Sequence, residues 1–106
     1  MSLPETSISP QAVYARIPDI VPRKIAGDTI LVAVRGELAR LERLHVLNAV
    51  GERIWGLLDG RRTVAEVSLD VTENFDIDAA TALADVTEFL ADLEDAGLAT
   101  VVSPGT

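Results

Sequence analysis

The chain has 106 residues, of which 48% are hydrophobic and 4% aromatic, and this composition predicts one folded domain with an aliphatic core. Its formal net charge of -8 argues against nucleic acid as a partner, because binding to phosphates needs a basic face. The sequence contains no cysteine, which excludes disulfides and thiolate metal sites, and it shows neither a signal-peptide core nor a membrane span of roughly 20 apolar residues, so a cytoplasmic protein is expected.

The start of the chain is predicted to be an extension outside the domain. Residues 1–10 contain serine and proline without a hydrophobic period, which is typical of a loose tail. Residues 11–17 are predicted to form a short helical turn, which Pro18 and Pro22 prevent from extending further. The predicted division of the chain is an N-terminal extension at residues 1–19, a domain at residues 20–102 and a C-terminal tail at residues 103–106.

Three strands are predicted next. Residues 21–26 and 29–34 are partly β-branched runs on either side of a Gly27-Asp28 turn, an arrangement typical of a β-hairpin. The second run is apolar on both faces, which predicts a central strand. A third strand is predicted over residues 42–46, after an irregular lead-in.

A first helix is predicted over residues 49–58. Apolar residues recur there three and four positions apart, the spacing that lines one face of an α-helix. Asn48 is the predicted N-cap, and Asp59-Gly60 is predicted to end the helix through a left-handed cap. Trp55, the single tryptophan, is predicted to lie in the core or half-buried against the sheet.

Two glycines, Gly51 and Gly56, lie inside this helical pattern. Each one costs a helix about 1 kcal/mol relative to alanine. Two interpretations are open: the glycines allow another backbone to approach closely, or they are simply exposed.

A second helix is predicted over residues 64–74, because Thr63 and Glu66 have the T-x-x-E spacing of a capping box. Together with the first helix and the tight turn before it, this helix resembles a helix-turn-helix.

A third helix is predicted over residues 79–96, capped by Asp76 or Asp78 and terminated by Gly97. Residues 98–102 are apolar and β-branched and are predicted to form a last strand or wing. The sequence therefore predicts an α+β fold, winged helix-turn-helix-like, in which a three-stranded antiparallel sheet is followed by three helices.

The sequence carries no recognisable catalytic constellation, so we expect no enzyme activity, no cofactor and no metal. His45 is the single histidine, and it has no second histidine or cysteine to work with, so it is predicted to be a surface or half-buried imidazole. Carboxylates recur at helical spacing in the third helix and are predicted to form a solvated acidic face rather than a metal site. These are Asp85, Glu88, Asp92 and Asp95.

Three stretches carry a resemblance to a known family. They are LNxxGxxIWxLLDGxRTxxEV at residues 47–67, FLxxLxxxGL at residues 89–98 and PRxIAGxTILV at residues 22–32. Over residues 20–101 the chain resembles the PqqD family, small peptide chaperones first associated with pyrroloquinoline quinone biosynthesis.

The resemblance implies a recognition element for RiPPs, the ribosomally synthesised and post-translationally modified peptides. Such a non-catalytic domain binds the leader of a precursor peptide and presents it to a modifying enzyme, often a radical SAM protein with a SPASM extension. The leader adds as an extra strand to the third strand of the sheet and lies against the third helix, a form of β-augmentation. The implied peptide-binding residues are Arg43, Leu44, His45 and Val46 on the strand, and Val86, Phe89, Leu90 and Leu93 on the helix.

Among the helix residues, Phe89 is the best candidate for the groove because it lies off the main apolar stripe. The stripe itself, which includes Leu83, Val86 and Leu90, must also fill the core. The extension before residue 20 departs from the minimal family domain, and it is expected either to cover the sheet edge or to pair with a second copy as a homodimer.

Two other functions stay open from the residues alone. The helix-turn-helix pattern is compatible with a winged-helix transcription regulator, but residues 64–74 carry Glu66, Asp70 and Glu73 and no basic residue for base contacts. An acidic winged-helix adaptor, which docks on an enzyme through the same sheet edge without binding a leader, is the third possibility.

Overall fold

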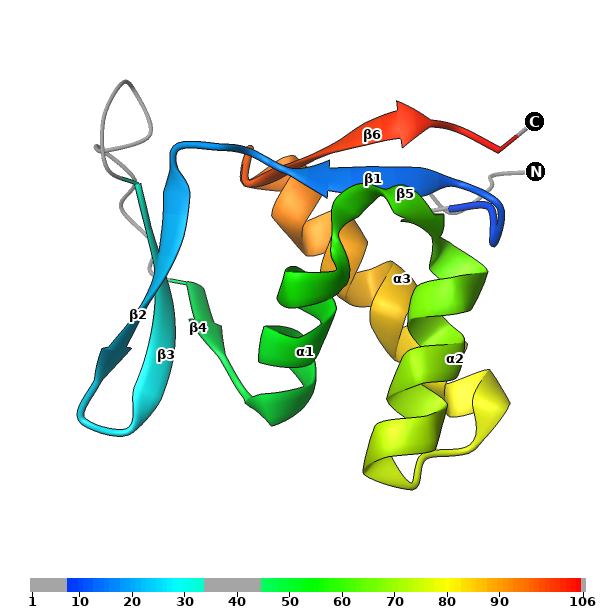
Figure 1. Cartoon of the computed structure of the whole chain (residues 1–106), viewed down its shortest axis with the longest axis horizontal. Helices are drawn as coiled ribbons and strands as arrows, with labels where there is room; N and C mark the ends of the chain where they lie inside the picture. The colour runs from blue at the N-terminus through cyan, green and yellow to red at the C-terminus, as the bar shows by residue number, and fades with distance from the viewer. Residues whose placement is uncertain (1–7, 34–44, 106) are drawn as a thin grey trace, which may run out of the picture.

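The computed structural model describes residues 8–33 and 45–105, which form six strands and three helices (Figure 1). In chain order these are β1 (Val13–Arg16), β2 (Ile20–Ile25), β3 (Asp28–Ala33), β4 (His45–Leu47), α1 (Ala49–Leu57), β5 (Asp59–Thr63), α2 (Val64–Phe75), α3 (Ala79–Asp95) and β6 (Ala99–Ser103). No helix in the described part is long and apolar enough to cross a membrane.

The strands form two antiparallel three-stranded sheets, ordered β2-β3-β4 and β5-β1-β6. The first sheet is the predicted one, with β3 at its centre, and the predicted α+β fold with three helices is confirmed. The second sheet lies across the top of the helices in Figure 1, and the first lies beside them. Residues 42–44 of the predicted third strand lie outside the described residues.

The hairpin turn falls one residue earlier than predicted. Ile25 pairs with Asp28, which leaves Ala26 and Gly27 as the two loop residues. Both have positive φ, 53° and 89°, as a type I′ turn requires. The turn is therefore Ala26-Gly27, and Asp28 already belongs to β3.

The predicted helical turn at residues 11–17 is wrong, because this segment contains β1. Val13 lies opposite Thr63 of β5, and Arg16 lies opposite Ala99 of β6. β1 is thus the central strand of the second sheet, and Tyr14 is buried. Residues distant in sequence supply its hydrogen bonds, so local propensity did not reveal it. The division of the chain at residue 20 stays a prediction.

The capping residues predicted for α1 and α2 are confirmed. The side chain of Asn48 accepts a hydrogen bond from the backbone N–H of Gly51 at 2.8 Å. Thr63 and Glu66 form the full capping box: the N–H of Glu66 donates to Oγ1 of Thr63 at 3.1 Å, and the N–H of Thr63 donates to Oε1 of Glu66 at 2.8 Å. Local side chains therefore define both helix starts.

The end of α1 depends on a different residue than predicted. The helix stops at Leu57, and its C-cap is Leu58 with φ -84°, whereas Gly60 has its positive φ of 81° inside β5. The guanidinium of Arg16 donates to the carbonyl oxygens of Trp55 and Gly56 at 3.2 and 3.1 Å. A side chain from β1 thus donates to carbonyls in the last turn of α1, and the carbonyl of Trp55 also accepts from the N–H of Leu58 at 3.2 Å.

For α3, Asp78 is the N-cap, and its side chain accepts from the backbone N–H of Thr81 at 3.2 Å. Asp76 instead caps the C-terminus of α2 in the left-handed conformation. Gly97 follows α3 with φ 77°, as expected for a helix terminator, and the N–H of Leu98 donates to the carbonyl of Leu93 at 2.8 Å.

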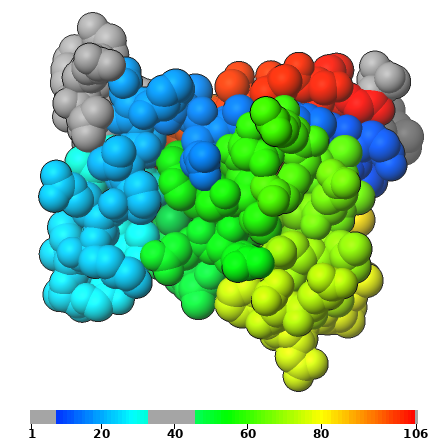
Figure 2. Space-filling model, viewed as in Figure 1, coloured from blue at the N-terminus to red at the C-terminus, as the bar shows by residue number. Residues whose placement is uncertain are grey.

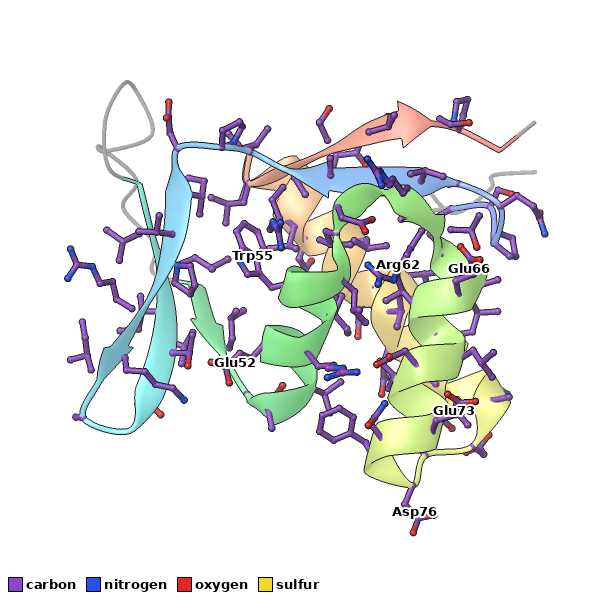
Figure 3. The ribbon with its side chains drawn as sticks, in the orientation of Figure 1. Glu52, Trp55, Arg62, Glu66, Glu73 and Asp76 are labelled. Carbon is purple, nitrogen blue, oxygen red and sulfur yellow. The ribbon has the colours of Figure 1, made fainter. Side chains whose placement is uncertain are left out.

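The core joins the three helices to both sheets. Trp55 is buried as predicted, and Figure 3 shows its side chain between α1 and the strands. The largest fully buried side chains are aliphatic: Ile54, Val64, Val67, Val71, Val86, Leu90, Leu93 and Leu98. An aliphatic core, as the composition predicts, holds the elements around α3.

Polar contacts fix α1 between the hairpin and α2. Oγ1 of the buried Thr29 donates to Oε2 of Glu52 at 2.8 Å, and Glu52 extends from α1 toward the hairpin in Figure 3. On the other side, Arg53 donates two hydrogen bonds to the Asp70 carboxylate, at 2.7 and 2.9 Å. Figure 2 shows α1 filling the surface between these two neighbours, so α1 sets the position of the first sheet relative to the helices.

Candidate functional site

A groove with a volume of about 530 Å³ lies between β4, the first turns of α1 and α3. On the strand side it is lined by Val46 and Leu47. Its floor is made by α1, through Val50, Gly51 and Ile54. The groove therefore lies beside the outer strand of the first sheet, where the family resemblance implies that a guest strand binds.

β4 forms the border of the first sheet on this side. Within residues 8–33 and 45–105 it pairs with β3 alone, with Thr29 opposite Leu47 and Ile30 opposite Val46. Leu47 is buried, whereas the side chain of Val46 is 57% exposed. An outer strand of this kind presents backbone N–H and C=O groups to a new strand.

The third helix separates its apolar residues between the core and the groove. Ala82, Val86, Leu90 and Leu93 are all 0% exposed and face the core. Phe89 is half-buried and lines the groove. The apolar stripe of α3 thus packs in the core, and Phe89 is the apolar side chain of α3 that lines the groove.

Of the eight predicted peptide-binding residues, the structure places two in the groove, Val46 and Phe89. Val86, Leu90 and Leu93 lie behind it in the core. His45 belongs to β4, and Arg43 and Leu44 lie outside the described residues.

Gly51 lies beside the ring of Phe89 in the groove. A Cβ atom added to this glycine would lie 3.5 Å from two atoms of the Phe89 ring and 3.4 Å from the side-chain oxygen of Asn48. The nearest neighbours of the buried glycine are therefore side chains and not another backbone. Gly56 is exposed and has nothing within 4 Å of such an atom. Close approach of another backbone, the first interpretation, therefore applies to neither glycine, whereas simple exposure describes Gly56.

The rim of the groove is acidic. Asp85, Glu88 and Asp92 line it from α3, and Asp28 lines it from the start of β3. The three α3 carboxylates are exposed, as predicted for a solvated face, but the sequence analysis did not foresee that they border the groove. Their spacing of three and four residues was the available signal, because it places them on one side of a helix.

No basic side chain among the described residues lines this groove. In the described part of the chain the ion pairs are Lys24–Glu52 at 3.6 Å, Arg53–Asp70 at 2.7 Å and Arg62–Asp59 at 2.6 Å, and none involves a rim carboxylate. The groove thus combines an apolar wall with negative charge.

Elsewhere, the perturbed carboxyl groups belong to structural contacts. Hydrogen bonds from Arg53 lower the pKa of Asp70, and backbone N–H groups of Arg61 and Arg62 lower the pKa of Asp59. Among the described residues, no group of three or more His, Asp or Glu side chains is arranged to hold a metal ion. These features are typical of helix and turn stabilisation rather than catalysis.

Comparison with known proteins identifies the architecture. The sequence profile of the family described as Coenzyme PQQ synthesis protein D (PqqD) matches residues 28–99. No curated protein matches the chain.

Two solved structures share the fold, each at 24% sequence identity. One is the solution NMR structure of the PqqD truncation of Methylobacterium extorquens PqqCD, which represents a functional and stand-alone RiPP recognition element; the TM-score is 0.69, over 90% of this chain and 96% of that one. The other is TbiB1 in complex with the TbiA(beta) leader peptide, with a TM-score of 0.62 over 80% of this chain and 93% of that one.

Proposed function

The chain belongs to the PqqD family, and on this premise we propose that it is a RiPP recognition element that captures the leader of a precursor peptide between β4 and α3. The observation that supports this proposal is the groove of about 530 Å³ beside the outer strand of the first sheet. TbiB1, which shares the fold, binds a leader peptide in its solved structure.

Strand addition is the binding mode that this geometry favours. A guest strand pairs its backbone with the N–H and C=O groups of β4, which gives affinity without demanding a particular sequence. Because side chains alternate along a strand, every second residue of the guest points to the same side and reaches the groove. Val46 and Phe89 supply the apolar surface that those residues contact.

The predicted binding residues then fall into two roles. Phe89 and Val46 contact the leader, and the backbone of His45 pairs with it along β4, as would Arg43 and Leu44 if the strand extends to them. Val86, Leu90 and Leu93 act indirectly, because their burial holds α3 at the distance from β4 that leaves the groove open.

The proposed role is non-catalytic and needs no cofactor. The modifying enzyme, for which a radical SAM protein with a SPASM extension is the expected partner, would do the chemistry on the peptide that this domain presents. Homodimer formation through the N-terminal residues also stays a proposal.

Titration with the leader peptide encoded beside this gene tests the proposal. We expect saturable binding by calorimetry, and NMR shift changes in the backbone amides of residues 45–47 and of α3. Leu69→Ala is a matched control for variants of Phe89, since Leu69 is an exposed apolar residue of α2, 58% accessible, that does not line the groove. Absence of binding, or shift changes confined to β5 and β6, would contradict the proposal.

A DNA-binding role is less compatible with the structure. In a helix-turn-helix protein the second helix enters the major groove and carries basic or amide side chains. Figure 3 shows Glu66, Glu73 and Asp76 along α2, and Asp70 of the same helix is paired with Arg53. This acidic helix would be repelled by DNA phosphates.

A further inference from the structure

This inference rests on the proposed function and names the chemistry of its partner. We infer that the groove selects a leader strand that carries positively charged side chains, lysine or arginine, at alternate positions on the side that faces α3. The grounds are the charge of the groove rim, the spacing of its carboxylates and the position of Phe89 beside them.

The charge of the rim is one-sided. Asp28, Asp85, Glu88 and Asp92 border the groove, and no basic residue of the described chain lines it. α3 contains no lysine or arginine over its 17 residues. A guest strand bound there places its side chains among these carboxylates, where positive groups are attracted and negative groups are repelled.

The spacing of the carboxylates fits alternate residues of a strand. With a helical rise of about 1.5 Å per residue, Glu88 and Asp92 are separated by about 6 Å along the axis of α3. Residues i and i+2 of a β-strand are about 6.6 Å apart and point to the same side. In a guest strand that runs along α3, two alternate basic residues can therefore each reach one carboxylate.

Phe89 favours the same kind of side chain. It follows Glu88 in sequence, and its ring lies on the groove wall against the floor at Gly51. Lysine and arginine have long apolar stems that pack on such a surface while their charged ends stay in water. The stem of the lysine or arginine contacts the Phe89 ring, and its charged end reaches a carboxylate. Glutamine lacks the positive charge, and glutamate would be repelled by the carboxylates.

The experiment compares the synthetic leader encoded beside this gene with a version in which each lysine and arginine is replaced by glutamine. Both peptides are titrated by fluorescence anisotropy into the full chain and into the Glu88→Gln/Asp92→Asn variant. Glu73→Gln/Asp95→Asn is the matched control, because it removes the same two charges from exposed positions outside the groove.

We expect the natural leader to bind the unmodified chain roughly two- to thirtyfold more tightly than the glutamine version, the range for two exposed ion pairs. This preference should shrink at high salt, fall in Glu88→Gln/Asp92→Asn, which leaves only Asp28 and Asp85 on the rim, and persist in the control. Because all substituted side chains are exposed and nearly isosteric, loss of folding is not expected, and thermal unfolding checks it.

Three results would overturn the inference. They are a bound leader segment without basic residues, equal affinity of the two peptides, and a preference that the groove variant and the control retain equally. After any of these three results, binding of a leader in the groove would still support the proposed function. Failure of both peptides to bind would instead contradict the proposed function and the inference together.

Discussion

The two faces of α3 differ in burial and in chemistry, although their residues are interleaved in the sequence of one helix. The inner face presents Ala82, Val86, Leu90 and Leu93, each 0% exposed, to the core. The outer face presents Asp85, Glu88 and Asp92 to solvent at the groove rim. Phe89 lies on the boundary, half-buried and packed against the core.

Stability and recognition are therefore expected to be separable in this helix. An inner residue supports the groove only by holding α3 in place, so its replacement should act through unfolding. An outer residue contributes little to packing, so its replacement should change binding in a protein that stays folded.

The largest effect is expected for Leu90→Ala. Removing a fully buried leucine should lower the free energy of unfolding by about 2–5 kcal/mol, because the contacts are lost and a cavity is left. Denaturant unfolding followed by the fluorescence of Trp55 measures this change. In contrast, Leu69→Ala at an exposed position should stay within about 0.5 kcal/mol of the unsubstituted chain. Equal losses in the two variants would refute the assignment of Leu90 to the core.

Phe89→Ala should have a smaller effect on stability and a larger one on binding. Its ring is only half-buried, so we expect a loss of about 1–2 kcal/mol, less than for a fully buried phenylalanine. The affinity for the leader should fall by roughly tenfold or more, as for an aromatic residue central to an interface. Calorimetric titration at a temperature where the variant is folded checks this. Unchanged affinity would remove Phe89 from the site.

The helix glycines allow a finer test. Gly56→Ala should stabilise the chain by about 0.4–1 kcal/mol, because alanine restricts the unfolded chain and has free space around it. Gly51→Ala should give a similar or smaller gain, since the added carbon meets the Phe89 ring at an ordinary contact distance of 3.5 Å. Only Gly51→Ala narrows the groove, so only it should weaken leader binding. If both variants bind alike, Gly51 is not part of the binding surface.

At neutral pH the smallest effect is expected for Tyr14→Phe. Tyr14 contacts Glu94, which lies near the C-terminal end of α3. Burial, together with the charge of Glu94 and the hydrogen bond that Tyr14 donates to it at 3.3 Å, raises the pKa of Tyr14 to about 12. The unfolded chain should lose this proton near pH 10, before the folded chain does. The stability that depends on the neutral phenol is therefore complete below pH 10 and is lost as pH rises toward 12.

Tyr14 is the single tyrosine, so tyrosinate absorbance reports its ionisation directly. The melting temperature of the unsubstituted chain should fall more steeply between pH 10 and 12 than that of the Tyr14→Phe variant. Ionisation of Tyr14 near pH 10 in the folded protein would contradict both the burial of the phenol and its contact with Glu94.

The elements that could be predicted from the sequence are those whose stabilising groups lie close together in the chain. Asn48 and the pair Thr63 and Glu66 cap their helices through hydrogen bonds that span three residues, and Gly97 supplies the positive φ that ends α3. The hairpin and the PqqD resemblance were also evident, because both depend on short patterns of residues. Local hydrogen bonding and turn geometry are properties that a few neighbouring residues specify.

Features that depend on distant partners could not be predicted and became evident in the fold. β1 is a strand because β5 and β6 flank it. The last turn of α1 accepts hydrogen bonds from the guanidinium of Arg16, a residue distant in sequence. The assignment of Val86 and Leu90 to the core but Phe89 to the groove was also decided there. Helical periodicity shows which residues share a face, but the elements packed against that face determine which of its residues are covered.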